Sequence, residues 1–400
     1  MSKEKRRVPK LRFPGFTEDW EPYEFKNLFK KNLEKNNGKF KSDKTISIAK
    51  MTFNELGNGA SEESLDNYKV LRIGDIAFEG HENKDFKFGR FVMNDIGNGI
   101  MSPRFTTLRP IELLELDFWK EYINYESIMQ KKLVHSTKKG TMMHELVVDE
   151  FLKQEILVPP EKEQQHIGCL LKFLSKVISL QQRKLEHLNL KKKALLQKLF
   201  PKEGSRYPEL RFPGFTDAWE QRKLTSFTQR VKGNDGRMDL PTLTISASEG
   251  WLNQKDRFSA NIAGSEQKNY TLLRQGELSY NHGNSKLAKY GVVYVLKEYK
   301  EALVPRVYHS FKVDESYDAL FVEYYFSTKR PDRELAKLVS SGARMDGLLN
   351  IGYDEFTNIS IAVPTFSEQR QIVALLRRFD KFITLHQQEP FLCGNSVNGG

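Results

Sequence analysis

The sequence has 400 residues, too many for one ordinary domain and suited to two or three. Its 63 Lys and Arg outnumber 52 Asp and Glu, and this excess favours a polyanionic partner, nucleic acid before membrane, although a merely basic soluble protein fits the charge equally well. The two cysteines stand in no Cys/His ligand pattern and no run of about 18 apolar residues occurs, which argues against a zinc site, a disulfide framework and a membrane span, and predicts a cytoplasmic protein.

The opening segment of the chain returns in its second half. Residues 11–17, LRFPGFT, recur unchanged as residues 210–216, an offset of 199. Further matches are collinear, at an offset of 202 between residues 68–140 and 270–342 and at 205 from Val158 onward. Collinear matches with small insertions indicate one duplicated unit of about 200 residues, which is too long for a solenoid repeat.

Each copy has the same plan: a Pro/Gly/aromatic opening, a mixed region with short strand-like runs and turn signals, and a closing helix that begins after proline. We therefore predict an α+β fold with two similar mixed α/β domains, each followed by a long helix. The expected parts are a first domain at 1–158, a helix at 159–200, a linker at 201–208, a second domain at 209–363, a shortened helix at 364–388 and a disordered tail at 389–400.

The helix after Pro159-Pro160 has a seam with spacings of four and three. Its members are Ile167, Leu171, Leu174, Ile178, Gln181, Leu185, Leu188, Lys192, Leu195 and Leu199. A heptad period of this length predicts a coiled-coil partner helix, with packing along the helix's own domain as the alternative. Cys169 lies within the same apolar pattern, and we expect it to be a small core residue.

The second closing helix starts in the same way and then loses its pattern. Thr365-x-x-Glu368 matches a capping box. The seam stops after His386, and Pro390 is expected to end the helix. Residues 389–400 have no counterpart after Gln182.

The repeated LRFPGF openings, the two variable regions and the repeated Val-Pro…Glu-Gln helix starts resemble the specificity subunit of type I restriction-modification systems. The resemblance covers the chain to about Gln388. It implies that each variable region is a target-recognition domain that reads one half of a bipartite double-stranded DNA site, and that the long helices pack antiparallel as a spacer. It also implies a non-catalytic chain that directs two methyltransferase (modification) subunits and restriction subunits, with S-adenosylmethionine, ATP and Mg used by those partners.

The shortened second helix departs from the family pattern. It leaves open a truncated, inactive or free-standing DNA-binding remnant, and also a scaffold that holds two identical partners without touching DNA. The sequence contains no GxxxxGK[ST] phosphate loop and no adenine-methyltransferase motif, and residues 331–337 fit a charged helix face better than a nuclease box.

Phosphate contacts require Lys and Arg, whereas base edges are read by Arg, Lys, Asn and similar side chains. Both regions carry such residues close to glycines. The DNA-binding candidates are Lys84, Lys87, Arg90, Arg104, Lys138, Lys139, Asn284, Lys286, Lys289, Arg306 and Arg344. Residues matched between the copies, such as Lys84 with Lys286 and Arg104 with Arg306, suit phosphate contacts or structural roles better than base choice. His81 and His282 fit hydrogen bonding better than metal binding or acid-base chemistry.

Overall fold

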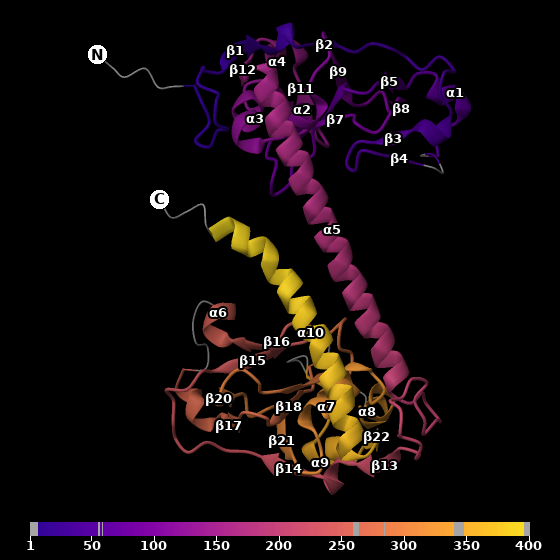
Figure 1. Cartoon of the computed structure of the whole chain (residues 1–400), viewed down its shortest axis with the longest axis vertical. Helices are drawn as coiled ribbons and strands as arrows, with labels where there is room; N and C mark the ends of the chain where they lie inside the picture. The colour runs from indigo at the N-terminus through magenta and orange to yellow at the C-terminus, as the bar shows by residue number, and fades with distance from the viewer. Residues whose placement is uncertain are drawn as a thin grey trace. The chain divides into compact units, whose positions relative to one another are not determined.

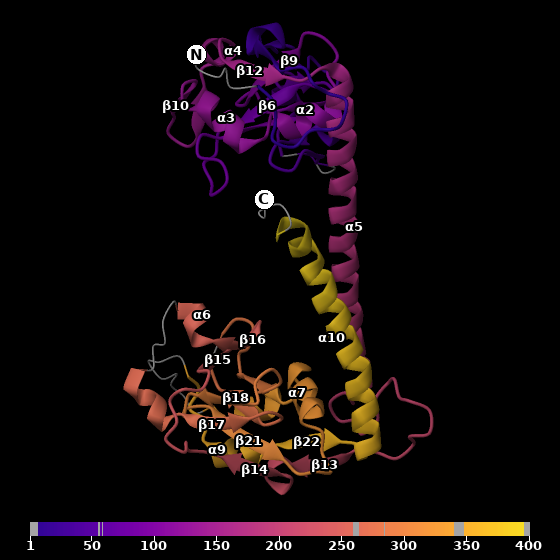
Figure 2. The same cartoon turned by 60° about the vertical axis from the view of Figure 1, so that its left-hand side comes forward.

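The computed structural model describes residues 7–54, 57, 59–258, 264–283, 285–339 and 348–395, with only the backbone described for residues 258, 265 and 388–395. The chain divides into two compact units, residues 1–180 (unit 1) and residues 181–400 (unit 2) (Figures 1 and 2). The division falls inside the long helix that joins them. The predicted α+β plan of two similar units, each with a long helix, is confirmed.

Unit 1 is built on a four-stranded antiparallel sheet in the order β2-β9-β6-β7, with two-stranded pairs β5-β8, β3-β4, β1-β12 and β10-β11. Its strands are β1 (Glu21–Glu24), β2 (Phe29–Lys31), β3 (Ile46–Ser47), β4 (Thr52–Phe53), β5 (Lys69–Leu71), β6 (Ile76–Glu79), β7 (Arg90–Met93), β8 (Gly99–Met101), β9 (Thr106–Pro110), β10 (Thr137–Lys139), β11 (His144–Leu146) and β12 (Glu155–Val158). Its short helices are η1 (Phe25–Asn27), η2 (Ser42–Lys44), α1 (Glu62–Leu65), α2 (Leu116–Tyr122), α3 (Glu126–Leu133) and α4 (Val148–Leu152).

The core of unit 1 is aromatic and lies between the sheet and the helices. Phe91 and Met93 alternate inward along β7, as expected for a strand with one buried face. Phe25 stacks on Phe151 of α4 with ring centroids 4.3 Å apart, and Trp119 of α2 packs edge-to-face on the ring of Phe29. These contacts fix α2 and α4 against the sheet.

Unit 2 repeats this topology apart from the β10–β11 pair, whose counterpart falls mostly outside the described residues. Its four-stranded sheet has the order β14-β21-β18-β19, and its two-stranded pairs are β17-β20, β15-β16 and β13-β22. The strands are β13 (Glu220–Lys223), β14 (Thr228–Val231), β15 (Leu243–Ser246), β16 (Gly250–Asn253), β17 (Thr271–Arg274), β18 (Leu278–Asn281), β19 (Val292–Val295), β20 (Glu301–Val304), β21 (His309–Val313) and β22 (Ser360–Val363). The short helices are η3 (Leu224–Ser226), α6 (Gln254–Phe258), η4 (Gly264–Asn269), α7 (Ala319–Ser327), α8 (Asp332–Leu338) and α9 (Tyr353–Thr357).

Helix α5 (Glu161–Leu199) begins directly after Pro159-Pro160, as predicted, and is 39 residues long. The two ends of its seam pack on globular cores. Ile167 contacts the core of unit 1, whereas Leu195 and Leu199 contact the core of unit 2. The heptad pattern predicts a partner helix along the whole seam. At its two ends the structure instead shows the alternative, in which the helix packs on the chain's own domains.

The middle of α5 is solvent-exposed in unit 1, with Leu174 and Ile178 about half exposed. Cys169 is exposed as well, so its expected place in the core is wrong. The physical reason is that only one stripe of this helix meets unit 1, and Cys169 lies off that stripe although its neighbours are apolar.

Helix α10 (Phe366–Asn395) is 30 residues long and continues past the expected end at Gln388. Pro390 therefore does not end it, and residues 389–395 are helical; residues 396–400 lie outside the described part of the chain. A proline removes one backbone N–H donor from a helix, and a helix can continue past it when the neighbouring turns keep their own hydrogen bonds. At its start, the Thr365 hydroxyl accepts from the backbone N–H of Glu368, which confirms half of the capping box.

Lys192 of α5 forms an ion pair with Asp380 of α10, with Nζ and Oδ1 2.5 Å apart. The hydroxyl of Tyr324, on α7, donates to the same carboxylate. These contacts tie both helices to α7 within unit 2. None of the helices in the described ranges is long and apolar enough to cross a membrane.

Candidate nucleic-acid interface

Three connections of unit 1 come together beside the four-stranded sheet. They are the β6–β7 loop (80–89), the β8–β9 turn (102–105) and the β10–β11 hairpin. The backbone N–H of His144 donates to the carbonyl oxygen of Gly80 at 2.8 Å, and a Cβ at Gly80 would lie only 1.9 Å from the His144 carbonyl oxygen. Only glycine therefore lets the hairpin approach the loop so closely.

A cavity of about 470 Å³ opens between the turn and the hairpin, lined by Arg104, Phe105, Met142 and His144 among others. The Arg104 guanidinium lies 3.5 Å from the Met142 sulfur and is otherwise exposed. The cavity has a mixed polar and apolar lining with one cation, Arg104, on its wall.

Five of the sequence-predicted residues in unit 1 lie exposed on these three connections: Lys84 and Lys87 on the loop, Arg104 on the turn, and Lys138 and Lys139 on the hairpin. Lys138 forms an ion pair of 3.3 Å with Glu145, and both side chains are more than half exposed. Such a pair contributes little to stability, so Lys138 can exchange it for a phosphate at small cost.

Arg90 differs from these residues because the fold already uses its guanidinium. Its Nε donates to Glu79 at 2.8 Å, its Nη2 donates to the carbonyl of Ala49 at 3.0 Å, and its guanidinium lies over the ring of Phe86. Contact with DNA would break this arrangement, and a structural role for Arg90 fits the observed contacts.

In unit 2 the equivalent β18–β19 loop and β20–β21 turn carry Lys286, Lys289 and Arg306, all exposed. Asn284 and Arg344 lie outside the described residues. The loops of both units end in a glycine with φ of +82°, Gly89 and Gly291, where a Cβ would meet backbone oxygen at 2.4 Å. This shared requirement explains why the sequence match between the copies includes that position.

His282 holds the unit 2 loop in place. Its Nδ1 lies 2.6 Å from the carbonyl oxygen of Leu349 and its Nε2 lies 2.9 Å from that of Val307. Its ring stacks on His309 with centroids 4.9 Å apart, and burial lowers the pKa of His309 to about 4. The prediction that His282 is a hydrogen-bonding histidine is confirmed. His81, which matches Gly283 and not His282 at the offset of 202, is exposed and lies 4.0 Å from Glu79.

An ion network lies near the start of β6, at the opposite end of that strand from the 80–89 loop. Glu34 accepts from Arg72 and Arg109, and Arg109 also pairs with the buried Asp75 at 2.8 Å. The hydrogen bond from Arg72 is the main cause that lowers the pKa of Glu34 to about 2. Arg72 and Arg109 are therefore held by carboxylates and are less available for an anionic ligand.

A buried ion pair was missed by sequence reasoning, and it occurs in both units. Arg12 donates twice to Glu163 at 2.7 Å, and Arg211 donates twice to Glu368 at 2.8 Å. The two carboxylates are nearly fully buried. The pair ties each LRFPGF segment to the first turn of the following long helix, and the repeated Arg and Glu were the signal that could have revealed it.

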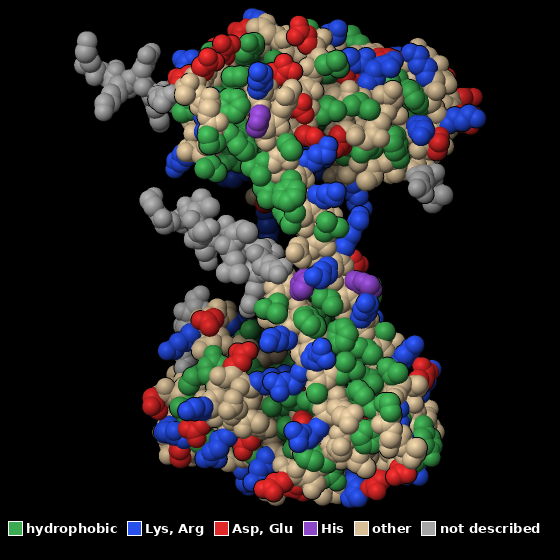
Figure 3. Space-filling model, viewed as in Figure 1, with side chains coloured by type: hydrophobic (Ala, Val, Ile, Leu, Met, Phe, Trp, Pro, Cys, Tyr) green, Lys and Arg blue, Asp and Glu red, His purple; other side chains and the backbone are tan. Residues whose placement is uncertain are grey.

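Basic and acidic side chains are interspersed on the visible face of both units, rather than forming one large basic field (Figure 3). The residues described contain no cluster of three or more His, Cys, Asp or Glu side chains that could hold a metal ion. Residues 332–337 lie in helix α8, with Pro331 at its N-cap and Lys337 paired to Glu334, as expected for a charged helix face. The geometry supplies exposed cations on loops, which suits binding of an extended polyanion.

Comparison with known proteins agrees with this picture. Residues 17–190 match the family described as type I restriction modification DNA specificity domain. A protein of Methanocaldococcus jannaschii, provisionally named as the type I restriction enzyme MjaX specificity subunit, is 26% identical over 206 residues, which is 46% of this chain and 46% of that protein. The chain thus matches about half the length of this relative.

Two solved structures have a similar fold over nearly the whole chain. The type I restriction-modification S subunit from M. genitalium has a TM-score of 0.56 at 12% identity, covering 96% of this chain and 94% of that one. A chain from a structure of the assembly and conformational transition of a type I restriction-modification system has a TM-score of 0.50 at 17% identity, covering 97% and 96%. Residues 17–190 are therefore similar to type I restriction-modification DNA specificity domains, and the second half of the chain repeats the fold of the first.

Proposed function

We propose that this protein is the non-catalytic DNA-recognition subunit of a restriction-modification complex, with each unit reading one half of a bipartite double-stranded DNA site. The observation that carries the proposal is the specificity-domain match of residues 17–190 together with the repetition of that unit in residues 181–400. Two similar readers on one chain suit a target with two half-sites, because each reader must sit in register with its own stretch of groove.

Within this proposal, the matched cations of the two units contact phosphates. Lys84 and Lys286 lie on equivalent loops, and Arg104 and Arg306 lie on equivalent turns, all of them exposed. Residues present in both units cannot distinguish two different half-sites, whereas phosphate contacts are the same at every sequence. Base choice then depends on segments that differ between the units, including those around β3–β4 and β15–β16.

The proposed partners are two methyltransferase subunits and the restriction subunits. S-adenosylmethionine, ATP and Mg would be bound by those partners and not by this chain. The repeated LRFPGF segments, anchored in each unit by an arginine–glutamate pair, are suited to bind two copies of one partner because they present the same surface twice.

The test is repeated selection from a pool of random DNA duplexes with the purified full chain. We expect enrichment of two short motifs separated by a constant number of base pairs. The affinity for the selected duplex should fall steeply with salt, and Lys84→Ala and Lys286→Ala should each reduce the salt slope by about 1 and weaken binding about equally for all sequences.

Lys153→Ala is the matched control, because Lys153 is also exposed but pairs with Glu150 on α4. It should change neither the slope nor the selected motifs. Failure to enrich any motif, combined with affinity that does not depend on salt, would contradict the proposed function.

A further inference from the structure

Unit 1 has a large apolar cavity of about 870 Å³ between the N-terminal segment, α2, α3 and the first turns of α5. Hydrophobic side chains gather on the part of unit 1 nearest to that segment (Figure 3). The lining that matters here consists of Trp20, Phe118, Tyr122, Ile167, Leu170 and Leu171. An open apolar hollow of this size on a protein surface is typical of a binding site.

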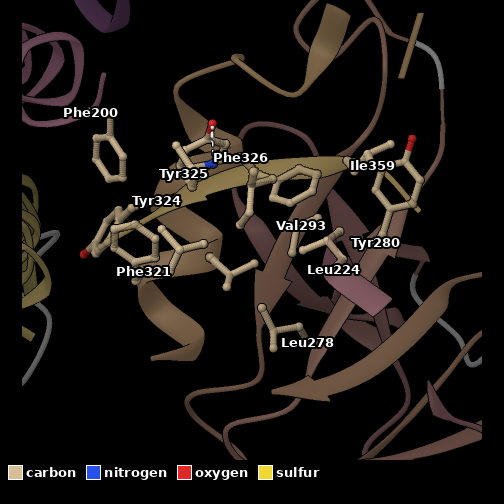
Figure 4. Close-up of a cluster of buried hydrophobic side chains, with 14 of the residues drawn as sticks. Phe200, Leu224, Leu278, Tyr280, Val293, Phe321, Tyr324, Tyr325, Phe326 and Ile359 are labelled. Atoms are coloured by element: carbon tan, nitrogen blue, oxygen red, sulfur yellow. Dashed lines mark hydrogen bonds between the residues drawn. The ribbon is translucent and has the colours of Figure 1, made fainter. Parts of the chain in front are cut away.

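The internal repeat shows what fills the same place in unit 2. The counterparts of these residues at the established offsets are Trp219, Leu320, Tyr324, Ile372, Leu375 and Leu376. They belong to a hydrophobic core that also contains Leu195, Leu196, Leu199 and Phe200 at the end of α5. The ring of Phe200 lies 6.0 Å from that of Trp219. It lies 5.5 Å from the ring of Phe321 and 5.8 Å from that of Tyr325, and Figure 4 shows these residues.

In five of the six matched pairs the residue of unit 1 is the more exposed one, whereas Phe118, at 2% exposed, is more buried than its counterpart Leu320. Ile372 is 1% exposed, whereas its counterpart Ile167 is only half-buried. Leu170 is 42% exposed, whereas its counterpart Leu375 is partly buried against the core. Nearly the same apolar set is thus more deeply buried in unit 2, where the end of α5 packs on it, than among the described residues of unit 1.

We propose that the cavity of unit 1 binds, in trans, the last two turns of an amphipathic helix from a separate polypeptide. Its apolar residues would have the spacing of Leu195, Leu196, Leu199 and Phe200. A second copy of this chain is not the donor, because its α5 end is already part of the core of its own unit 2. The inference does not depend on DNA recognition, since it rests on packing alone.

One polar feature distinguishes the two sites. In unit 2, Arg330 donates to the carbonyl oxygens at the end of α5, at 2.9 Å to Gln197 and Phe200 and 2.5 Å to Pro201. The counterpart of Arg330 at the offset of 202 is Ile128, which lines the unit 1 cavity. A guest helix in unit 1 therefore lacks this cap and is held by apolar contact, which makes its binding weaker than the packing in unit 2.

The test uses a fluorescent peptide of residues 182–203 and the purified full chain, with binding followed by anisotropy. We expect saturable binding of one peptide per chain. Leu170→Glu should weaken it about 10-fold or more, because a carboxylate replaces an apolar contact. Leu190→Glu, on the same helix but not among the residues that line the cavity, should leave it unchanged, since Leu190 is also exposed, at 59%. A peptide with Phe200→Ala should bind more weakly by a similar factor.

Ile128→Arg provides a gain that no unfolded variant could produce, since it restores the cap and should tighten binding about 3-fold or more. Absence of saturable binding, or binding that ignores Leu170→Glu, would overturn the proposal. A chain that ends at Gln387 should bind the peptide like the full chain. A 10-fold increase in its affinity would show that the chain's own C-terminal segment fills the cavity, and this would also overturn the trans assignment.

Discussion

Replacement of Arg211 by methionine should destabilise unit 2 by about 3 to 5 kcal/mol. The Glu368 carboxylate is 1% exposed and accepts both hydrogen bonds of the guanidinium at 2.8 Å. Without Arg211 the carboxylate stays buried without its cation. Two lost hydrogen bonds to a charged group are each worth about 1.5 to 3 kcal/mol, which agrees with the cost of breaking a buried pair.

The equivalent change in unit 1, Arg12→Met, should cost about 1 kcal/mol less. Glu163 keeps one further donor, because the indole Nε1 of Trp20 lies 3.2 Å from its Oε2. In unit 2 the indole Nε1 of Trp219 is buried without a hydrogen-bond partner among the described residues. The two units thus provide an internal comparison of one ion pair with and without a supporting donor.

The assay is hydrogen exchange of the full chain in increasing urea, read separately on the strand pairs β1–β12 and β13–β22. Arg222→Met is the control, since its pair with Glu220 is exposed and should contribute less than about 1 kcal/mol. A loss for Arg211→Met no larger than that of the control would refute the reasoning. Equal losses for Arg12→Met and Arg211→Met would refute the role of the Trp20 indole.

Two further changes test the interior of unit 2. Burial lowers the pKa of His309 to about 4 in the folded protein, whereas a histidine in the unfolded chain has a pKa near 6.5. The unfolded chain therefore binds the proton more readily. The free energy of unfolding of unit 2 should fall by about 2 kcal/mol as the pH falls from about 6.5 to 4. In urea titrations across that range, His309→Gln should remove most of this loss, and an unchanged pH dependence would contradict the assignment. Asp380→Asn should weaken the contact of α10 with Lys192 and Tyr324 and cost about 1 kcal/mol, measured by exchange in α10; equal exchange in both proteins would contradict it.

Some properties of this protein were determined by the sequence alone. The duplication, the α+β plan and the start of α5 after Pro159-Pro160 could be predicted because they depend on repeated residues and on local helix signals. Lys84 and Lys286 lie exposed on loops, as a turn-rich segment with glycine favours, and their contact with DNA stays a prediction.

Other properties were decided only by tertiary structure. Arg12 and Glu163 are 151 positions apart, so no local periodicity reveals that they pair. Cys169 lies in an apolar pattern yet is exposed, because the pattern does not determine which side of the helix packs on the rest of the protein. Helix α10 continues through Pro390, because the sequence alone does not determine whether a helix ends at a proline. Burial depends on which other parts of the chain pack on a surface, and this is why Ile167 and Ile372, at matched positions of the repeat, differ in exposure.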